Sequence, residues 1–384
     1  MMNFKLKVKF IQQLTRLSST ISINSANNVL TTSIPSLSSF NCNWDKVISE
    51  SKQLINYSST NFNSKCLSNQ EIFKIVQQLN QLADFNHPIQ EDAKRLVLNG
   101  NNSIGIRGLI VLLIAKAIGI KCYNNLTESK LVQRQYSLAE MTEMIYSAHQ
   151  IHKGVINLNS KVNCDQLINN QSIGNSVSIL SGDYLLANVW KGLGELRDTK
   201  VVELMAKSLS DLVEGQFIVT TESINCLKDV HSLIDYWTSI NFRLNGSLLA
   251  NACQSVAVLG NHNLIIQRKV YQFGLNFALA LQSADEMKLF LTNQFNHNQF
   301  YPIHSAPVLM YFSSTQDDYE NFKTIGGTIN QRKLYEAIRS SSAIDLTRDM
   351  KNSHTIKALQ LLESLPINET IKSLENILST LVIL

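Results

Sequence analysis

The sequence has few prolines, no paired-cysteine motif and no long hydrophobic run, and each of these absences excludes a class of protein. Only 5 prolines occur in 384 residues, which suits long uninterrupted helices because proline breaks a helix interior. The 6 cysteines include no CxxC pair, so we expect reduced thiols inside the cell rather than a zinc site or a disulfide framework. The longest apolar run, residues 109–115, is bounded by Arg107 and Lys116 and is far shorter than the ~20 residues that a bilayer helix needs. The sequence therefore predicts no transmembrane segment.

A basic surface of the kind that binds nucleic acid is also missing from the body of the chain. The formal net charge is +4, but residues 1–44 contain Lys5, Lys7, Lys9 and Arg16 and no acidic residue. The remainder therefore carries 30 basic and 30 acidic residues. A neutral body of this kind predicts no nucleic-acid partner.

Residues 1–44 have the composition of a mitochondrial transit peptide. Their basic residues are separated by apolar ones, and Ser, Thr and Asn are abundant, whereas a secretory signal needs an unbroken apolar segment. We predict a transit peptide over residues 1–44 and a location in the mitochondrial matrix. A disordered tail is the alternative.

Beyond this leader the sequence shows helical periodicity and almost no strand alternation. We therefore predict one all-helical domain over residues 45–384, with polar connections over residues 123–130 and 157–174. Helices are expected over residues 44–57, 70–85, 96–120, 139–157, 175–194, 201–214, 234–259, 265–291, 306–311, 331–340, 342–363 and 369–384.

The helix over residues 139–157 carries the most informative pattern. Its apolar residues follow the i, i+3, i+4 spacing of a helix with one buried face, and the polar face ends in Lys153, Gly154 and Asn157. Residues one and four apart share a helix surface, so these three are expected to lie together. The pattern resembles the first aspartate-rich helix of the trans-prenyl diphosphate synthases, which has aspartate at all three positions.

A second segment, residues 273–289, resembles the second aspartate-rich helix of that family. Gln282 and Asp285 match the family, Glu286 is a longer carboxylate, and Leu289 replaces the final aspartate. Gln282 is a candidate substrate contact by this resemblance.

The family's diphosphate-binding positions are only partly present. Arg107 matches an arginine that holds the second substrate's diphosphate, so it is the other candidate substrate contact. Ile104 stands where the family has a lysine, and Leu244 and Asn245 replace a Lys-Thr pair. The family's Arg-Arg-Gly is missing from residues 160–170.

The resemblance implies an isoprenoid synthase-type helical bundle around a central cavity, with the two motif helices facing each other. Six carboxylates there would total −6, whereas Lys153, Asp285 and Glu286 give −1. Magnesium prefers several anionic oxygen ligands, so we expect no catalytic residue and no metal ligand in this chain. The Mg²⁺ is expected in a catalytic partner.

Within the family, residues 43–52 and 152–159 are similar to the non-catalytic subunits of heteromeric polyprenyl (decaprenyl- or solanesyl-type) diphosphate synthases. This implies a heterodimer or heterotetramer that makes the polyprenyl precursor of the ubiquinone side chain, with peripheral association with the inner membrane left open. The alternative is a free-standing helical scaffold or lipid-binding protein that keeps the fold. A third interpretation is a self-sufficient synthase that uses Asp285 and Glu286.

Two other groups of residues suggest metal sites, and neither is favoured. His149 and His152 are one helical turn apart, with Asp183 further along the chain, but histidine metal sites need further ligands and supporting hydrogen bonds. Asp317 and Asp318 lie in a polar stretch that is more typical of a solvated loop.

Overall fold

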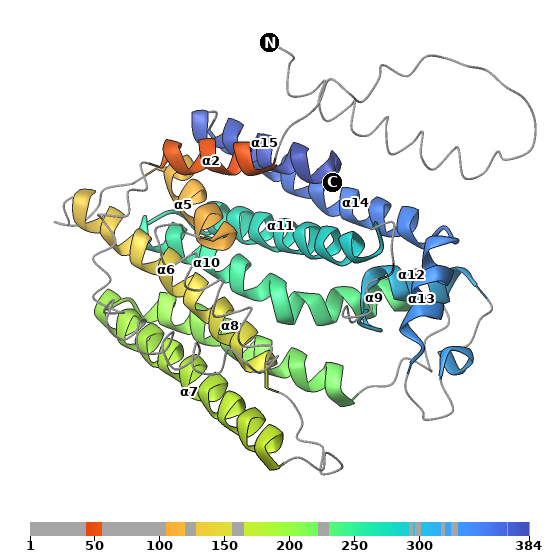
Figure 1. Cartoon of the computed structure of the whole chain (residues 1–384). Coiled ribbons are helices and arrows are strands. Elements are labelled where there is room, and N and C mark those ends of the chain that lie inside the picture. Colours follow the sequence, from red (N-terminus) through yellow and green to blue (C-terminus); the bar gives the residue numbers. More distant parts are fainter. Residues whose placement is uncertain are drawn as a thin grey trace, which may run out of the picture. The chain divides into compact units, whose positions relative to one another are not determined.

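The described part of the chain is helical. The computed structural model describes residues 44–55, 105–119, 128–155, 165–221, 230–291, 295, 301–315, 319–323, 329–366 and 368–383. Apart from one isolated β-bridge between Lys323 and Ile329, these residues form helices and their connections (Figure 1). This confirms the all-α prediction. The predicted helix over residues 70–85 and residues 1–43 of the predicted leader lie outside the described residues.

The chain divides into two compact units, which are described separately. The first unit comprises Met1–Ser49, Ser210–Ala250 and Lys269–Leu384, and the second comprises Glu50–Leu209 and Asn251–Arg268. The prediction of a single domain over residues 45–384 stays a prediction. The helices that contribute residues to both units are α2 (Trp44–Leu54), α8 (Thr199–Thr221), α10 (Ser247–Leu259) and α11 (Leu264–Leu291).

The second unit is built on α5 (Ile106–Ile118), α6 (Glu128–Lys153) and α7 (Asp165–Leu196). Helix α5 is apolar on all sides, and 10 of its residues are buried, as expected of a helix enclosed by protein. It packs against α6, and α6 packs against α7 (Figure 1). A small apolar cluster between α6 and α7 contains Ala148, Ile151 and Leu185.

The first unit gathers the C-terminal helices around an aromatic core. Its other helices are α9 (Val230–Asn241), α12 (Ala306–Ser314), α13 (Gln331–Arg339), α14 (Ala343–Glu363) and α15 (Glu369–Ile383). Tyr301 lies at the centre of this core, with its ring 5.0 Å from that of Phe290 and 5.3 Å from that of Tyr335. Close aromatic packing of this kind adds to the burial energy of the rings.

Several helix boundaries differ from the sequence-based prediction. Helix α5 begins at Ile106, because Gly105 is extended at its N-cap; residues 96–104 of the predicted helix lie outside the described residues. It ends as expected at Gly119, whose φ of 71° favours glycine. Helix α6 begins at Glu128, since Leu131, Gln135 and Leu138 continue its buried face.

The polar stretch predicted over residues 157–174 is wrong from residue 165 onward, because α7 begins at Asp165. Its first turns lack an apolar period, but they extend a long helix, and each residue added to an existing helix costs far less than nucleation. The single helix predicted over residues 234–259 is interrupted by a π-helical turn, η4 (Phe242–Gly246). Within the described ranges, none of the helices has the length and hydropathy to cross a membrane.

Candidate functional site

The C-terminal end of α6 holds the residues of the first degenerate motif. Helix α6 ends at Lys153, and Gly154 forms a turn whose N–H donates to the carbonyl of Ile151 at 3.0 Å. The helix predicted to continue to Asn157 is therefore wrong at residues 154 and 155, because glycine readily ends a helix. The side chain of Lys153 is exposed and Gly154 is buried. Asn157 lies outside the described residues, as does Ile104.

Arg107 lies at the N-terminus of α5 and faces α6. Its guanidinium carbon is 3.4 Å from the ring centroid of Tyr146, and only 8% of Arg107 is exposed. Stacking of this kind, together with a nearby carboxylate, is a common way to hold a buried arginine.

The nearby carboxylate belongs to Glu143 of α6. Its Oε1 accepts a hydrogen bond from the backbone N–H of Gly108 at 2.6 Å. Burial raises the pKa of Glu143, while the charges of Arg107 and Lys52 and the backbone N–H groups of α5 lower it part of the way. A side chain of this protein therefore occupies an anion position at a helix N-terminus. Helical periodicity in the sequence gives no sign of this contact between Glu143 and α5.

The two histidines of α6 differ in their surroundings. His149 is buried, and its pKa is lowered to about 4 by burial and by the charges of Lys153, His152 and Arg107. His152 Nε2 lies 3.4 Å from Asp183 Oδ1. Among the described residues no three His, Cys, Asp or Glu side chains are grouped as metal ligands. Cationic and imidazole groups thus predominate at this end of α6.

Gly182 of α7 has no side chain, and this leaves room for the ring of His152. A Cβ added at Gly182 would lie 2.1 Å from His152 Nε2, so only glycine leaves room for the ring in this position. The same nitrogen lies 3.3 Å from the carbonyl oxygen of Ile179. His152 therefore joins the end of α6 to the middle of α7.

In the first unit, Glu286 of the second degenerate motif is enclosed by hydrogen-bond donors. Its Oε2 accepts from the indole Nε1 of Trp237 at 2.9 Å and from the backbone N–H of Ala306 at 2.7 Å. Its Oε1 accepts from Gln282 Nε2 at 2.8 Å. Burial raises the pKa of Glu286, and these three hydrogen bonds oppose the rise. The carboxylate thereby joins α9, α11 and the N-terminus of α12.

The other two positions of this motif point elsewhere. Asp285 is exposed and accepts a hydrogen bond from Lys288 Nζ at 3.0 Å, one turn along α11. Leu289 is half-buried and packs against the aromatic core of the first unit. Asp285 thus faces solvent, Glu286 is enclosed by hydrogen-bond donors, and Leu289 faces an apolar core.

The residues that replace the family's Lys-Thr pair lie in the π-helical turn η4. Asn245 Nδ2 donates to Asn241 Oδ1 at 2.9 Å, and neighbouring Arg243 is 3.6 Å from Glu214. Asp317 and Asp318 lie outside the described residues.

These donor sets do not fit a magnesium cluster. Magnesium is held by carboxylate oxygens and water in near-octahedral geometry. At the first motif the described residues offer an ammonium and a glycine, and at the second both oxygens of Glu286 are already used by donors. Asp285 is one exposed carboxylate, paired with a lysine.

Comparisons with known proteins agree with this description. The family model for polyprenyl synthetase matches residues 94–294. A human protein named all trans-polyprenyl-diphosphate synthase PDSS2 is 34% identical over 344 residues, covering 87% of this chain and 86% of the human protein. A rice protein named solanesyl-diphosphate synthase 1, mitochondrial, is 26% identical over 275 residues, covering 68% of this chain and 63% of its own length.

Solved structures show the same fold. A polyprenyl synthase from Caulobacter crescentus aligns with a TM-score of 0.60 at 19% identity, covering 87% of this chain and 98% of its own. A decaprenyl diphosphate synthase from Rhodobacter capsulatus aligns with a TM-score of 0.59 at 16% identity, covering 88% and 98%. The family model matches more than half of the chain, and the human relative exceeds 30% identity over most of it. This chain therefore belongs to the polyprenyl synthetase family.

Proposed function

We propose that this chain is the non-catalytic subunit of a heteromeric trans-polyprenyl diphosphate synthase that makes the polyprenyl precursor of the ubiquinone side chain. The observation that carries the proposal is that the described residues of the two degenerate motifs offer no set of free carboxylates. Lys153 and Gly154 supply no carboxylate, and Glu286 is committed to Trp237, Gln282 and Ala306. A chain of this family without clamped magnesium cannot ionise an allylic diphosphate, since metal ions stabilise the leaving group.

The catalytic partner supplies what this chain lacks. It carries both aspartate motifs and binds the Mg²⁺ that assists addition of isopentenyl diphosphate to an allylic diphosphate. This chain stabilises or regulates that partner. Arg107 and Gln282 make internal contacts with Tyr146 and Glu286, which supports structural roles for both and leaves substrate contact to the partner.

Helix α7 offers a surface for such a partner. Seven of its exposed positions follow a 3-4 spacing along the helix, with large residues at Ile173, Leu180 and Trp190; this stripe is Ile173, Ser176, Leu180, Asp183, Ala187, Trp190 and Gly194. Leu180 is 69% exposed and Trp190 44%. A 3-4 repeat of this kind is the spacing with which one helix packs along another.

The small residues of this stripe alternate with the large ones. In an antiparallel pairing of helices, Ser176, Ala187 and Gly194 provide room for large side chains of the opposite helix. Between residues 166 and 190, Asp183 is the only charged side chain of α7. A helix so poor in charge suits the apolar centre of a stable subunit interface. We place the catalytic subunit on this stripe, in a heterodimer or heterotetramer.

The mitochondrial matrix is the proposed location. The basic, Ser-rich leader over residues 1–44 supports import, and the rice relative is named mitochondrial.

A prenyl-transfer assay of this chain alone, of a catalytic subunit alone and of the two together tests the proposal. With Mg²⁺ and both substrates, we expect no product from this chain alone and more product from the pair than from the partner alone. Turnover by the isolated chain would overturn the proposal. Failure of the two chains to associate would instead favour a free-standing scaffold or lipid-binding protein.

A further inference from the structure

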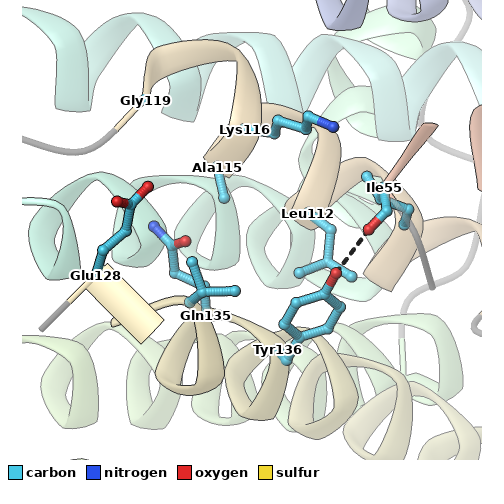
Figure 2. Close-up of a pocket in the computed structure, with 9 residues that line it drawn as sticks. Ile55, Leu112, Ala115, Lys116, Gly119, Glu128, Gln135 and Tyr136 are labelled. Carbon is cyan, nitrogen blue, oxygen red and sulfur yellow. Dashed lines mark hydrogen bonds between the residues drawn. The ribbon is translucent and has the colours of Figure 1, made fainter. Parts of the chain in front are cut away.

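A cavity of about 310 Å³ lies in the second unit, between the C-terminal half of α5 and the N-terminal half of α6 (Figure 2). It is separate from the first degenerate motif. Gln135, which lines it, precedes Lys153 by 18 residues on the same helix, or about 27 Å at the rise of an α-helix. The cavity has the size of a small ligand pocket, and none of the residues of the two degenerate motifs lines it.

Two of the polar side chains around the cavity already have hydrogen-bond partners. Lys116 Nζ donates to the carbonyl of Leu54 at 2.6 Å. The Tyr136 hydroxyl donates to the carbonyl of Ile55 at 2.8 Å, the bond drawn in Figure 2. Apolar side chains make up much of the remaining wall; these are Ile55, Leu112, Ala115 and Val132.

Gln135 is the buried polar residue of this cavity. Only 5% of this residue is exposed, and in the described part of the chain its Nε2 has no hydrogen-bond partner. Figure 2 shows the amide pointing from α6 toward α5, among the side chains that line the cavity. A buried amide without a partner is unfavourable, so native proteins normally satisfy such a group with protein, water or ligand.

The charges at the rim indicate that the ligand is neutral. Lys116 and Glu128 are both exposed and of opposite sign, so the cavity has no net charge to compensate. Moving an unpaired charge into an apolar space is strongly unfavourable. An uncharged molecule needs no compensating charge from the rim and places no unpaired charge in the cavity.

We propose that this cavity binds a small uncharged molecule with an apolar body and one hydrogen-bond-accepting oxygen, which takes the hydrogen bond from Gln135 Nε2. A carbonyl compound has this chemistry. The apolar body contacts Leu112, Ala115 and Val132, and the oxygen faces α6. This inference does not depend on the role of the chain in prenyl transfer.

Two probes of nearly the same shape test it on the full-length chain. Acetophenone presents a carbonyl oxygen, and α-methylstyrene replaces that oxygen with a methylene group that accepts no hydrogen bond. Dissociation constants are measured by ligand-observed NMR titration. We expect acetophenone to bind about three- to tenfold more tightly, the range that one net hydrogen bond gives.

Two glutamine variants on the same helix separate the specific contact from a general effect. Gln135→Leu is expected to bind both probes equally, and its ligand-free Tm is expected to rise because the unpaired buried amide is gone. Gln133→Leu alters an exposed glutamine two residues away and should keep both the preference and the wild-type Tm.

A third variant, Ala115→Phe, fills the cavity and should abolish binding of both probes. The proposal is overturned if neither probe binds the wild-type chain, since the cavity then holds water only. It is equally overturned if Gln135→Leu retains the wild-type preference for acetophenone.

Discussion

The indole of Trp237 donates a hydrogen bond to Glu286 at 2.9 Å, so the carboxylate at the second position of the degenerate motif joins α9 to α11. The carboxylate also receives the backbone N–H of Ala306. A magnesium ion at Glu286 would have to displace both donors. These hydrogen bonds indicate that Glu286 stabilises the fold, whereas the sequence alone shows it only as part of a degenerate metal-binding motif.

Replacing Glu286 should lower stability far more than replacing its neighbour. Glu286→Ala leaves the buried donors of Trp237 and Ala306 unpaired, and we expect a loss of about 3 kcal/mol in the free energy of unfolding. Glu286→Gln keeps an acceptor oxygen and should lose less. Asp285→Asn alters an exposed ion pair and should change stability by less than about 0.5 kcal/mol. Urea denaturation of the three variants measures this order.

The same variants distinguish a structural role from a catalytic one. In the complex with the catalytic subunit, Glu286→Gln should retain prenyl transfer. A folded Glu286→Gln complex that loses activity would mean that this carboxylate does bind metal.

Glu143 should be essential to the packing of α5 on α6. Glu143→Ala removes the acceptor of the Gly108 N–H and leaves Arg107 buried without its carboxylate, so we expect a loss of about 3 kcal/mol. Lys130→Ala, at an exposed position of the same helix, should stay within about 0.5 kcal/mol of wild type. Chemical denaturation gives both values, and equal effects would contradict the role assigned to Glu143.

Magnesium should not stabilise the isolated chain. A ligand that binds only the folded state raises Tm as its concentration increases, and the described motif residues offer no set of magnesium ligands. We therefore expect a flat Tm in a thermal-shift titration with millimolar MgCl₂ and a diphosphate analogue. An active relative with both aspartate motifs provides the positive control, and a concentration-dependent rise in this chain would oppose the expected result.

Glu140 should make stability depend on pH. Burial raises its pKa from 4.5 to about 7, so the folded state binds this proton more tightly than the unfolded chain does. The resulting stabilisation is complete below about pH 4.5 and is lost as the pH rises through 7. The side chain of Glu140→Gln does not ionise, so this variant does not lose stability in this way. As the pH rises from 5 to 8, its free energy of unfolding should increase by about 2–3 kcal/mol relative to that of the wild type. Denaturation curves at several pH values measure the difference, and parallel pH profiles of the two proteins would refute it.

Association with the catalytic subunit should depend on the exposed stripe of α7. Leu180→Glu introduces a charge at a residue that is 69% exposed, so folding should be little affected while the affinity for the partner falls at least tenfold, as expected when a charge is buried at an interface. Glu195→Lys, at an exposed position outside the stripe, is the matched control. Analytical ultracentrifugation of the mixed chains reads out the complex, and unchanged affinity of the Leu180→Glu chain would exclude this surface.

Much of the helical architecture follows from local sequence patterns. Apolar residues at helical spacing predicted α11 to within one residue of its observed bounds at Leu264–Leu291, and the low proline content allowed such lengths. Gly119 ends α5 as expected because glycine readily adopts its positive φ. The start of α7 was missed because its first turns follow no apolar period.

The sequence by itself determined which groups are available at the motif positions: an ammonium at residue 153, a bare backbone at residue 154 and a carboxylate at residue 286. Only the tertiary structure decided what those groups contact. Glu286 meets an indole, an amide and a helix N-terminus, Glu143 caps α5, and Gln135 faces a cavity with its amide nitrogen unpaired. The physical reason is that helical periodicity depends on neighbours along the chain, whereas each of these environments is created by residues of another helix.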